Sequence, residues 1–456
     1  MSGPAGVGAL LRESLLRNSA MLLLASVELA AGGFLFWQLV AHLFPAAEVG
    51  RASVLISAST LISTLALLGM NNSLIRYLSE WPDRARTVNS GTTLVAGAAA
   101  AGAVGFAAGT HVLAPELTAL RHPAEVAVFV GLTVAAAVSM VNDNLFVALR
   151  RSGFVLSRNS LVVALRLALP FALLGGSAFG IFAAYWLAVA VALIPYLVVL
   201  ARSFGLPPRL RASAGRLRAM WRYSAGNYLA TAILMMPSLL MPILVAHRTD
   251  AAHAAYYYIA SLVASVQALV PQATARSFFA EVMTGGGRLR ELLPRVLGLT
   301  AALQLPVLLV LVVAGRFVLR LFGAEYARAY PLLVLLAVTL TLSSVGFVGS
   351  TLLLISGRLR LLVQVSLAGC AVSLTGSFLL ADRGLVWVGG SMLAGEVVLT
   401  LGYAPIIGAA MHAGRLAAAA AGPDPADPTG TGTATGTGTG AGTGTATGTG
   451  TGTGTG

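Results

Sequence analysis

Apolar stretches of about 20 residues recur along most of the chain, and they constrain its fold more than any other feature. A helix needs about 20 mostly apolar residues to cross the hydrocarbon core of a membrane. The sequence contains twelve such stretches, at 19–44, 52–75, 88–111, 126–149, 158–176, 178–201, 223–246, 253–275, 293–315, 331–356, 361–380 and 385–410. We therefore predict an all-α integral membrane protein with twelve transmembrane helices.

The composition supports this fold class and excludes several others. Of the 456 residues, 57% are hydrophobic and 10% are charged, whereas globular domains carry about 25% charged residues. The single Cys370 excludes a disulfide framework and a cysteine metal cluster, and we expect no metal and no cofactor. Because the sequence lacks a P-loop, a GxSxG elbow and an HExxH motif, we predict no enzymatic activity.

Arginine sets the predicted orientation in the membrane. The formal net charge is +13, and all 29 basic residues are arginine. With the N-terminus inside, 21 arginines fall in inner segments, seven fall in outer segments, and only Arg166 lies well within an apolar stretch. Cytoplasmic loops retain an excess of basic residues, so we predict a multi-pass protein of the plasma (inner) membrane with both termini in the cytoplasm. Topology thereby explains most of the positive charge, and no nucleic-acid partner is expected.

An internal repeat divides the chain into two halves. Residues 39–42 (LVAH) recur as 244–247, and residues 17–20 (RNSA) recur loosely as 222–225 (RYSA), both 205 residues further on. An even number of helices per half gives both halves the same orientation, and such pairs of bundles suit alternating access to a central site. We predict the following organisation: an N-terminal six-helix lobe at 1–201, a basic cytoplasmic linker at 202–222, a C-terminal six-helix lobe at 223–410, and a disordered Thr-Gly tail at 411–456.

Residues that weaken helices stand at matching positions of the two halves. At the 205-residue offset, Gly32 and Gly33 correspond to Pro237 and Ser238, and Pro242 follows five residues after Pro237. Both Gly and Pro can bend a helix, and such paired interruptions point to a substrate site. One hypothesis is that Gly32, Gly33, Pro237 and Pro242 are hinges. The alternative is that they serve close packing, for which membrane helices often use small residues.

Several segments resemble one family of membrane proteins. They are residues 39–45 followed by 48–52, residues 68–77, residues 321–331, and Gly357-Arg358. These segments resemble conserved stretches of the polysaccharide (oligosaccharide) flippases in the multidrug/oligosaccharidyl-lipid/polysaccharide (MOP) exporter superfamily. The resemblance covers nearly all of residues 10–410 and departs from the family at Arg51-Ala52, where many relatives have tyrosine. Lipid II flippases of the same superfamily usually have fourteen transmembrane helices, so the predicted twelve argue against that branch.

The resemblance implies a flippase for cell-surface polysaccharide synthesis. Such a protein translocates a polyprenyl-diphosphate-linked oligosaccharide from the cytoplasmic to the outer leaflet. The implied partners are the lipid-linked oligosaccharide and membrane lipid, with a polysaccharide polymerase or glycosyltransferases as further candidates.

Ionisable residues within the apolar stretches are candidate functional groups, because an unpaired charge in hydrocarbon costs several kcal/mol. Glu28 lies about 14 Å along the first stretch, near its middle. Together with Asp143 and Glu396 it is a candidate for binding a coupling proton or sodium ion. For Glu28 and Glu396 the alternative is a neutral carboxyl group that is hydrogen-bonded in the core.

Arg166 is the leading candidate for contacting the diphosphate, because a guanidinium group binds phosphate oxygens bidentately. It is predicted at a depth similar to that of Asp143, so the alternative is a structural ion pair between the two. Arg76 and Arg276 stand at related inner ends, where they could attract the lipid diphosphate or simply anchor the helices. Asn71 and Asn72, like Gln267, could bind sugar hydroxyls or bridge helices instead.

Three functions stay open at this point. The first is the flippase, which predicts arginines in the cavity and a lateral opening to lipid. The second is a drug/cation antiporter of the same fold, which predicts a mainly acidic or aromatic cavity. The third is a scaffold of a polysaccharide-synthesis complex, which predicts no transport.

Overall fold

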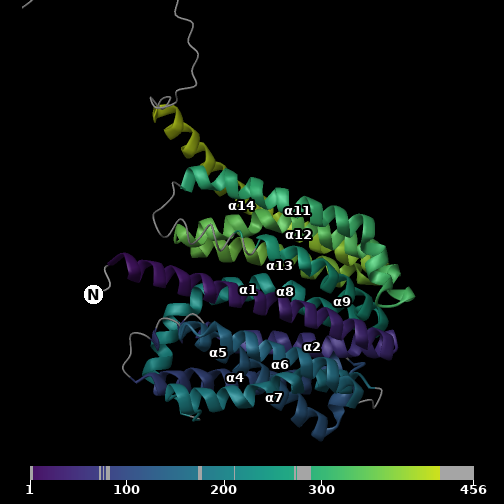
Figure 1. Cartoon of the computed structure of the whole chain (residues 1–456). Helices are drawn as coiled ribbons and strands as arrows, with labels where there is room; N and C mark the ends of the chain where they lie inside the picture. The colour runs from purple at the N-terminus through teal and green to yellow at the C-terminus, as the bar shows by residue number, and fades with distance from the viewer. Residues whose placement is uncertain are drawn as a thin grey trace, which may run out of the picture.

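The chain folds into long helices that run roughly side by side (Figure 1). The computed structural model describes residues 4–70, 73–74, 77–78, 83–113, 115–172, 177–209, 211–271, 274 and 289–421. Every regular element within these ranges is a helix. The predicted all-α membrane fold is confirmed.

Among the described residues, six long helices belong to the first half of the chain and six to the second half. The first six are α1 (Pro4–Leu43), α2 (Ala46–Ala66), α4 (Arg84–Leu113), α5 (Pro123–Ala148), α6 (Ser152–Ala172) and α7 (Ala178–Phe204). The second six are α8 (Ala214–Arg248), α9 (Ala251–Ser265), α11 (Leu289–Arg320), α12 (Tyr330–Ile355), α13 (Leu359–Leu380) and α14 (Leu385–Ala421). Short 3-10 helices are η1 (Thr118–Arg121), η2 (Val266–Ala268), η3 (Ala324–Ala329) and η4 (Ala381–Arg383).

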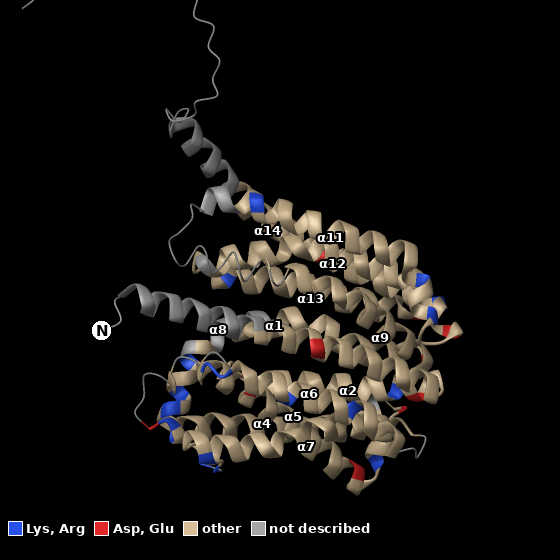
Figure 2. Cartoon of the chain, viewed as in Figure 1, with Lys and Arg blue, Asp and Glu red and all other residues tan. Residues whose placement is uncertain are grey.

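Eleven of the described helical segments are long and apolar enough to cross a membrane. The twelfth predicted stretch falls within α8, in which the described residues include the apolar segment Ala232–Arg248. Acidic and basic residues gather mainly at the two ends of the helices, and few lie between (Figure 2). This distribution is expected when the middles of the helices lie in hydrocarbon.

The repeat predicted from short motifs extends to the helix starts. Helices α2 and α9 begin at Ala46 and Ala251, which are 205 residues apart. The later pairs, α5 with α12, α6 with α13 and α7 with α14, begin 207 residues apart. The change of two residues coincides with η3, which has six residues where η1 has four. The halves are two six-helix lobes related by a parallel repeat.

Helices α1 and α8 lie between the rest of the two lobes (Figure 1). Helix α1 packs on α6 and helix α8 packs on α13, as the repeat requires. The lobes meet where α2 packs against both α8 and α9. One buried apolar core crosses this boundary, since Trp37 and Val40 of α1 belong to the same cluster as Tyr257 and Ile259 of α9.

The connection between the lobes is shorter than the predicted linker at 202–222. Helix α7 continues to Phe204 and ends at Gly205, whose φ of 65° is the left-handed conformation common at helix ends. Helix α8 already begins at Ala214, so the second part of the predicted linker is helical. We call the end of the bundle where this connection lies the linker end and the opposite end the far end. Of the predicted tail, residues 411–421 belong to α14 and residues 422–456 lie outside the described residues.

Candidate functional site

A buried arginine lies among aromatic side chains where the lobes meet. Arg166 of α6 is only 4% exposed, and its guanidinium carbon lies 3.6 Å from the ring centroid of Tyr185 in α7. The Nε of Arg166 also donates a hydrogen bond to the carbonyl oxygen of Tyr185 at 3.3 Å. Trp37 of α1 and Tyr258 of α9 complete the group, with ring centroids 4.5 Å apart. We call Trp37, Arg166, Tyr185 and Tyr258 the seam cluster.

The seam cluster joins three helices of the first lobe to one helix of the second lobe. The Trp37 and Tyr185 rings lie 6.5 Å apart, centroid to centroid, so Trp37 is close to both Tyr185 and Tyr258. Within the described part of the chain, Arg166 forms no ion pair with a carboxylate. A buried guanidinium group held by one ring face and one carbonyl oxygen remains able to bind an anion.

The predicted ion pair between Asp143 and Arg166 is wrong. Asp143 pairs with Arg158, whose Nη1 lies 2.9 Å from the Oδ1 of Asp143. The prediction placed the start of this helix at residue 158, whereas α6 begins at Ser152. Arg166 therefore lies about 21 Å along α6, while Arg158 lies only about 9 Å along it, close to the depth of Asp143 near the end of α5.

Arg158 also organises a polar group inside the first lobe. It donates hydrogen bonds to the hydroxyl group of Ser139 and to the Oδ1 of Asn159, the latter at 2.9 Å. Asn159 in turn donates from Nδ2 to the carbonyl oxygen of Ala25 in α1 at 3.1 Å. The Arg158 and Asp143 side chains are 7% and 31% exposed, so a mostly buried ion pair connects α5, α6 and α1.

Glu28 faces the same contact between α1 and α6. Ala25 and Gly32 share its helical face, and these two residues contact Asn159 and Val163 of α6. The Oε2 of Glu28 is buried and lacks a hydrogen-bond partner among the described residues. The predicted ion-coupling candidate thus lies within the first lobe, on the face of α1 that packs against the polar group.

The second lobe contains a neutral polar group instead. Gln267 of η2 donates from Nε2 to Thr341 of α12 at 2.5 Å, and Gln304 of α11 donates to the carbonyl oxygen of Gln267 at 3.2 Å and to Ser344 at 3.1 Å. Gln267 therefore bridges helices, the alternative considered for it. Glu396 of α14 forms none of these hydrogen bonds. Its carboxylate lies against Gly346 of α12.

The hinge candidates lie in unbroken helices. Helix α1 continues through Gly32 and Gly33, and α8 continues through Pro237 and Pro242. A Cβ atom added to Gly32 would lie 2.3 Å from Val163, whereas one on Gly33 would have nothing within 4 Å. Close packing thus accounts for Gly32, and the hinge role of the four residues stays a prediction.

Four of the predicted site residues lie outside the described residues. They are Arg76, Arg276, Asn71 and Asn72.

Close contacts join the lobes at both ends of the bundle. At the far end, a Cβ atom on Gly50 of α2 would lie 1.6 Å from the carbonyl oxygen of Ala251 in α9. At the linker end, Gly69 has a φ of +73°, and a Cβ atom there would lie 2.5 Å from Ser224 of α8. Ser73 donates to the carbonyl oxygen of Met220 at 2.7 Å, and Tyr228 of α8 donates to that of Leu65. The lobes are thus closed at both ends, with the seam cluster between these contacts.

Sequence reasoning missed Arg158 and the aromatic part of the seam cluster. Arg158 was counted among the inner-loop arginines, although Ser152 is a residue type that often starts a helix and could have indicated the earlier helix start. Trp37, Tyr185 and Tyr258 gave no such signal, because their helices are distant in the sequence and only tertiary packing brings them together.

The fold is shared with solved membrane transporters. It is similar to a multidrug resistance MATE family transporter of the MOP superfamily in an inward-facing conformation, with 14% identity, 88% of this chain and 95% of that chain covered, and a TM-score of 0.65. It is also similar to the lipid II flippase MurJ in an inward closed conformation, with 9% identity, 87% and 91% covered, and a TM-score of 0.69.

A third similar structure is a MOP superfamily transporter from Pyrococcus furiosus, with 14% identity, 89% and 96% covered, and a TM-score of 0.61. At these identities the likeness establishes the common fold, and the structural neighbours agree with the sequence resemblance at the level of the MOP superfamily. No family model and no curated protein matches the sequence.

Proposed function

We propose that this protein is a flippase that moves a polyprenyl-diphosphate-linked oligosaccharide across the plasma membrane for cell-surface polysaccharide synthesis. The observation that carries the proposal is the buried Arg166 in the seam between the lobes, which lacks a carboxylate partner among the described residues. A charge kept inside a membrane protein is costly, and it usually marks a substrate or ion pathway. An anionic cargo supplies the negative charge that the seam lacks.

The diphosphate would reach Arg166 only when the lobes separate at one end. In the closed arrangement, Trp37 packs close to Tyr185, which lies beside Arg166, and to Tyr258 of the other lobe. Opening at the linker end would part Gly69 and Ser73 from α8, and opening at the far end would part Gly50 from α9. Alternating between these two openings exposes a central site to one side at a time.

Other candidate residues take supporting roles in this proposal. Glu28 is the leading site for a coupling ion, because its buried Oε2 lacks a hydrogen-bond partner among the described residues. Asp143 and Glu396 are further coupling candidates. The remaining candidates would attract the lipid diphosphate or bind its sugars at the inner ends of the helices; they are Arg76, Arg276, Asn71 and Asn72.

The similar solved structures support a transport function, but the cargo has to be inferred from the chemistry of the site. The same fold serves a multidrug resistance transporter and a lipid II flippase. In the Pyrococcus furiosus transporter, a reverse polarity of the binding pocket suggests a different function. We take the positive charge of Arg166 as the feature that favours an anionic lipid cargo over a cationic drug.

A drug/cation antiporter is the second candidate, and the aromatic rings of the seam cluster favour it. Faces of Trp37, Tyr185 and Tyr258 could bind an organic cation. The presence of Arg166 against one of these rings argues against this candidate, because it would repel such a cargo.

Reconstitution into vesicles tests the proposal. Purified protein is placed in vesicles containing a fluorescent polyprenyl-diphosphate oligosaccharide, and its movement to the opposite leaflet is followed by a membrane-impermeant quencher. We expect faster movement than in protein-free vesicles, and no uptake of ethidium in parallel vesicles. Ethidium transport without lipid movement would favour the antiporter. No transport of either probe would contradict both and favour the scaffold, whose expected partners are a polysaccharide polymerase or glycosyltransferases.

A further inference from the structure

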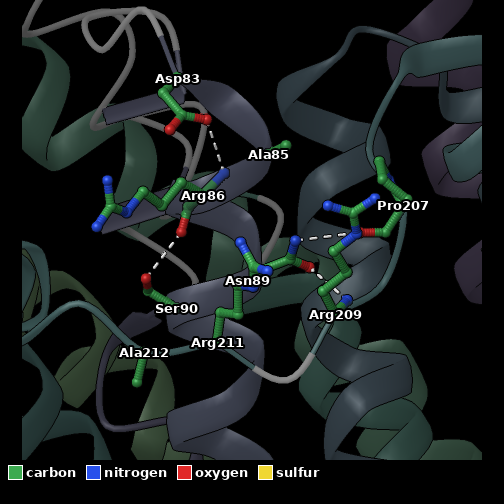
Figure 3. Close-up of a pocket in the computed structure, with 9 residues that line it drawn as sticks. All are labelled: Asp83, Ala85, Arg86, Asn89, Ser90, Pro207, Arg209, Arg211 and Ala212. Atoms are coloured by element: carbon green, nitrogen blue, oxygen red, sulfur yellow. Dashed lines mark hydrogen bonds between the residues drawn. The ribbon is translucent and has the colours of Figure 1, made fainter.

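A pocket of about 500 Å³ lies at the linker end, between the start of α4 and the connection between the lobes. Figure 3 shows the residues that line it. One wall is the first turns of α4, with Arg86, Asn89 and Ser90, and Asp83 precedes this helix. The other wall is the connection between the lobes, which supplies Pro207, Arg209, Arg211 and Ala212. Its volume is within the range of about 300–1,000 Å³ that is usual for small-molecule sites.

Hydrogen bonds hold the connection against α4. The Nδ2 of Asn89 donates to the carbonyl oxygen of Pro207 at 3.1 Å, and its Oδ1 accepts from the backbone N–H of Arg209 at 3.0 Å (Figure 3). The hydroxyl of Ser90 accepts from the N–H of Ser213 at 3.1 Å. Asn89 is 7% exposed and Ser90 is fully buried. The backbone that carries Arg209 and Arg211 is therefore fixed relative to α4.

The charges that line the pocket are mainly positive. The guanidinium groups of Arg86, Arg209 and Arg211 form no hydrogen bond or ion pair with the described residues. Asp83, the one acidic residue among the described residues that line the pocket, is already engaged, because its Oδ1 accepts the backbone N–H of Arg86 at 3.0 Å and its Oδ2 lies 3.7 Å from Nη2 of Arg216. The described part of the pocket therefore carries more positive than negative charge.

We propose that this pocket binds the phosphate group of an anionic ligand, bridging Arg86 of the first lobe to Arg209 and Arg211 of the connection. Guanidinium groups suit phosphate because their planar N–H donors match its oxygens in pairs. All three arginines line this one pocket, so their positive charges favour an anion there. The ligand is either a phosphate-bearing solute or the headgroup of an anionic phospholipid, which share this chemistry.

Such a ligand would stabilise the present placement of the connection. Arg216 at the start of α8 already donates to the carbonyl oxygen of Asp83 at 2.8 Å and to Thr87 of α4 at 2.6 Å. A phosphate bound by both walls would add further contacts between α4 and the connection. It would thereby keep the start of α8 packed on α4. None of the residues that line the pocket is one to which we assign cargo binding, so ligand binding here can be tested apart from the proposed flippase activity.

Binding measurements on the purified full-length protein in neutral detergent test the proposal. Inorganic pyrophosphate is titrated by calorimetry as the soluble probe. Phosphatidylglycerol and phosphatidylcholine are compared by native mass spectrometry as the lipid probes. The test variant is Arg86→Gln/Arg209→Gln/Arg211→Gln, and the matched control is Arg202→Gln/Arg218→Gln/Arg222→Gln, which removes equal charge at the linker end from exposed residues outside the pocket.

We expect the parent and the control to bind pyrophosphate, or phosphatidylglycerol in preference to phosphatidylcholine, with the test variant weakened at least about tenfold. Pyrophosphate binding identifies a solute site, and selective phosphatidylglycerol binding identifies a lipid site. No binding by the parent, or equal losses in both triple variants, would overturn the proposal. Arg86→Gln alone provides a second variant that leaves the connection unchanged; equal affinity in this variant and the parent would overturn the bridging role.

Discussion

The two lobes share their helix order and spacing, but they differ in what they bury. The first lobe contains the Asp143–Arg158 ion pair, the buried Arg166 and the half-buried Glu28. At the 207-residue offset the equivalents of Asp143, Arg158 and Arg166 are Ser350, Val365 and Ser373, and at the 205-residue offset Glu28 corresponds to Ile233. The buried polar group of the second lobe consists of the neutral side chains of Gln267, Gln304, Thr341 and Ser344.

This difference in buried charge between the lobes shows which features the fold does not require. A lobe of this architecture forms with Ser373 packed against Gly395 where the other lobe has Arg166 against Tyr185. The apolar pattern that both lobes share therefore suffices for the helix packing. Because charges are costly to bury in a membrane, we propose that Arg166 and the Asp143–Arg158 pair, which have no charged equivalents in the second lobe, have a role beyond packing.

Among equivalent positions of the two lobes, substitutions of Asp143 and Ser350 should differ most in their effect on the free energy of unfolding. Asp143→Asn leaves Arg158 buried without its charge partner, and we expect it to lower the free energy of unfolding by about 3 kcal/mol, the low end for a broken buried pair, because Asp143 is partly exposed. Ser350→Ala in the second lobe should cost at most about 1 kcal/mol. Denaturant unfolding in detergent measures both, and equal effects would contradict the comparison.

The contact between Gly50 and Ala251 at the far end should give the second-largest loss of unfolding free energy. Gly50→Ala forces a Cβ atom onto the backbone carbonyl of Ala251, which cannot move aside as a side chain could. We expect a loss of about 2 kcal/mol in unfolding free energy. Gly33→Ala is the matched control in the same lobe, and it should be neutral or stabilising because nothing lies near the added methyl group. Similar losses in the two variants would remove Gly50 as a closure contact.

Glu28 of the first lobe and Glu396 of the second lobe allow the contribution of each lobe to transport to be compared. Glu28→Gln removes a charge while keeping the volume, so we expect transport to fall at least about tenfold with unfolding unchanged. Glu396→Gln in the second lobe should reduce transport less. The vesicle assay with the fluorescent lipid measures both rates. Normal transport by Glu28→Gln would end its coupling role, and a larger effect at Glu396 would move that role to the second lobe.

An ion pair at the surface should matter least. Arg248 at the end of α8 pairs with Asp382 of η4, and both side chains are partly exposed, at 30% and 54%. Its equivalent in the first lobe is Leu43, which has no charge. We expect Arg248→Gln to change the unfolding free energy by less than about 1 kcal/mol. A loss comparable to that of Asp143→Asn would show that side-chain exposure does not determine how much each ion pair contributes to stability.

The sequence predicted the fold well because apolar length and the repeat are properties of the chain itself. Helix positions and the parallel halves followed from stretches such as 126–149 and from the 205-residue offset. The start of α6 was missed because Arg158 looks like a loop residue until Asp143 and Ser139 bury it. The seam cluster was equally hidden, since Arg166 was found from its depth but its aromatic neighbours depend on how four helices pack.

The central claim is that Arg166 binds the anionic part of the cargo, and lipid movement in vesicles tests it most directly. The measurement compares the parent, Arg166→Gln and Arg166→Lys, with Ser373→Ala as the control at the equivalent position. We predict that Arg166→Gln slows movement at least about thirtyfold, the effect of losing about 2 kcal/mol from a buried charged contact. Arg166→Lys should recover part of the rate, and Ser373→Ala should match the parent. Unchanged lipid movement in a folded Arg166→Gln protein would contradict the account.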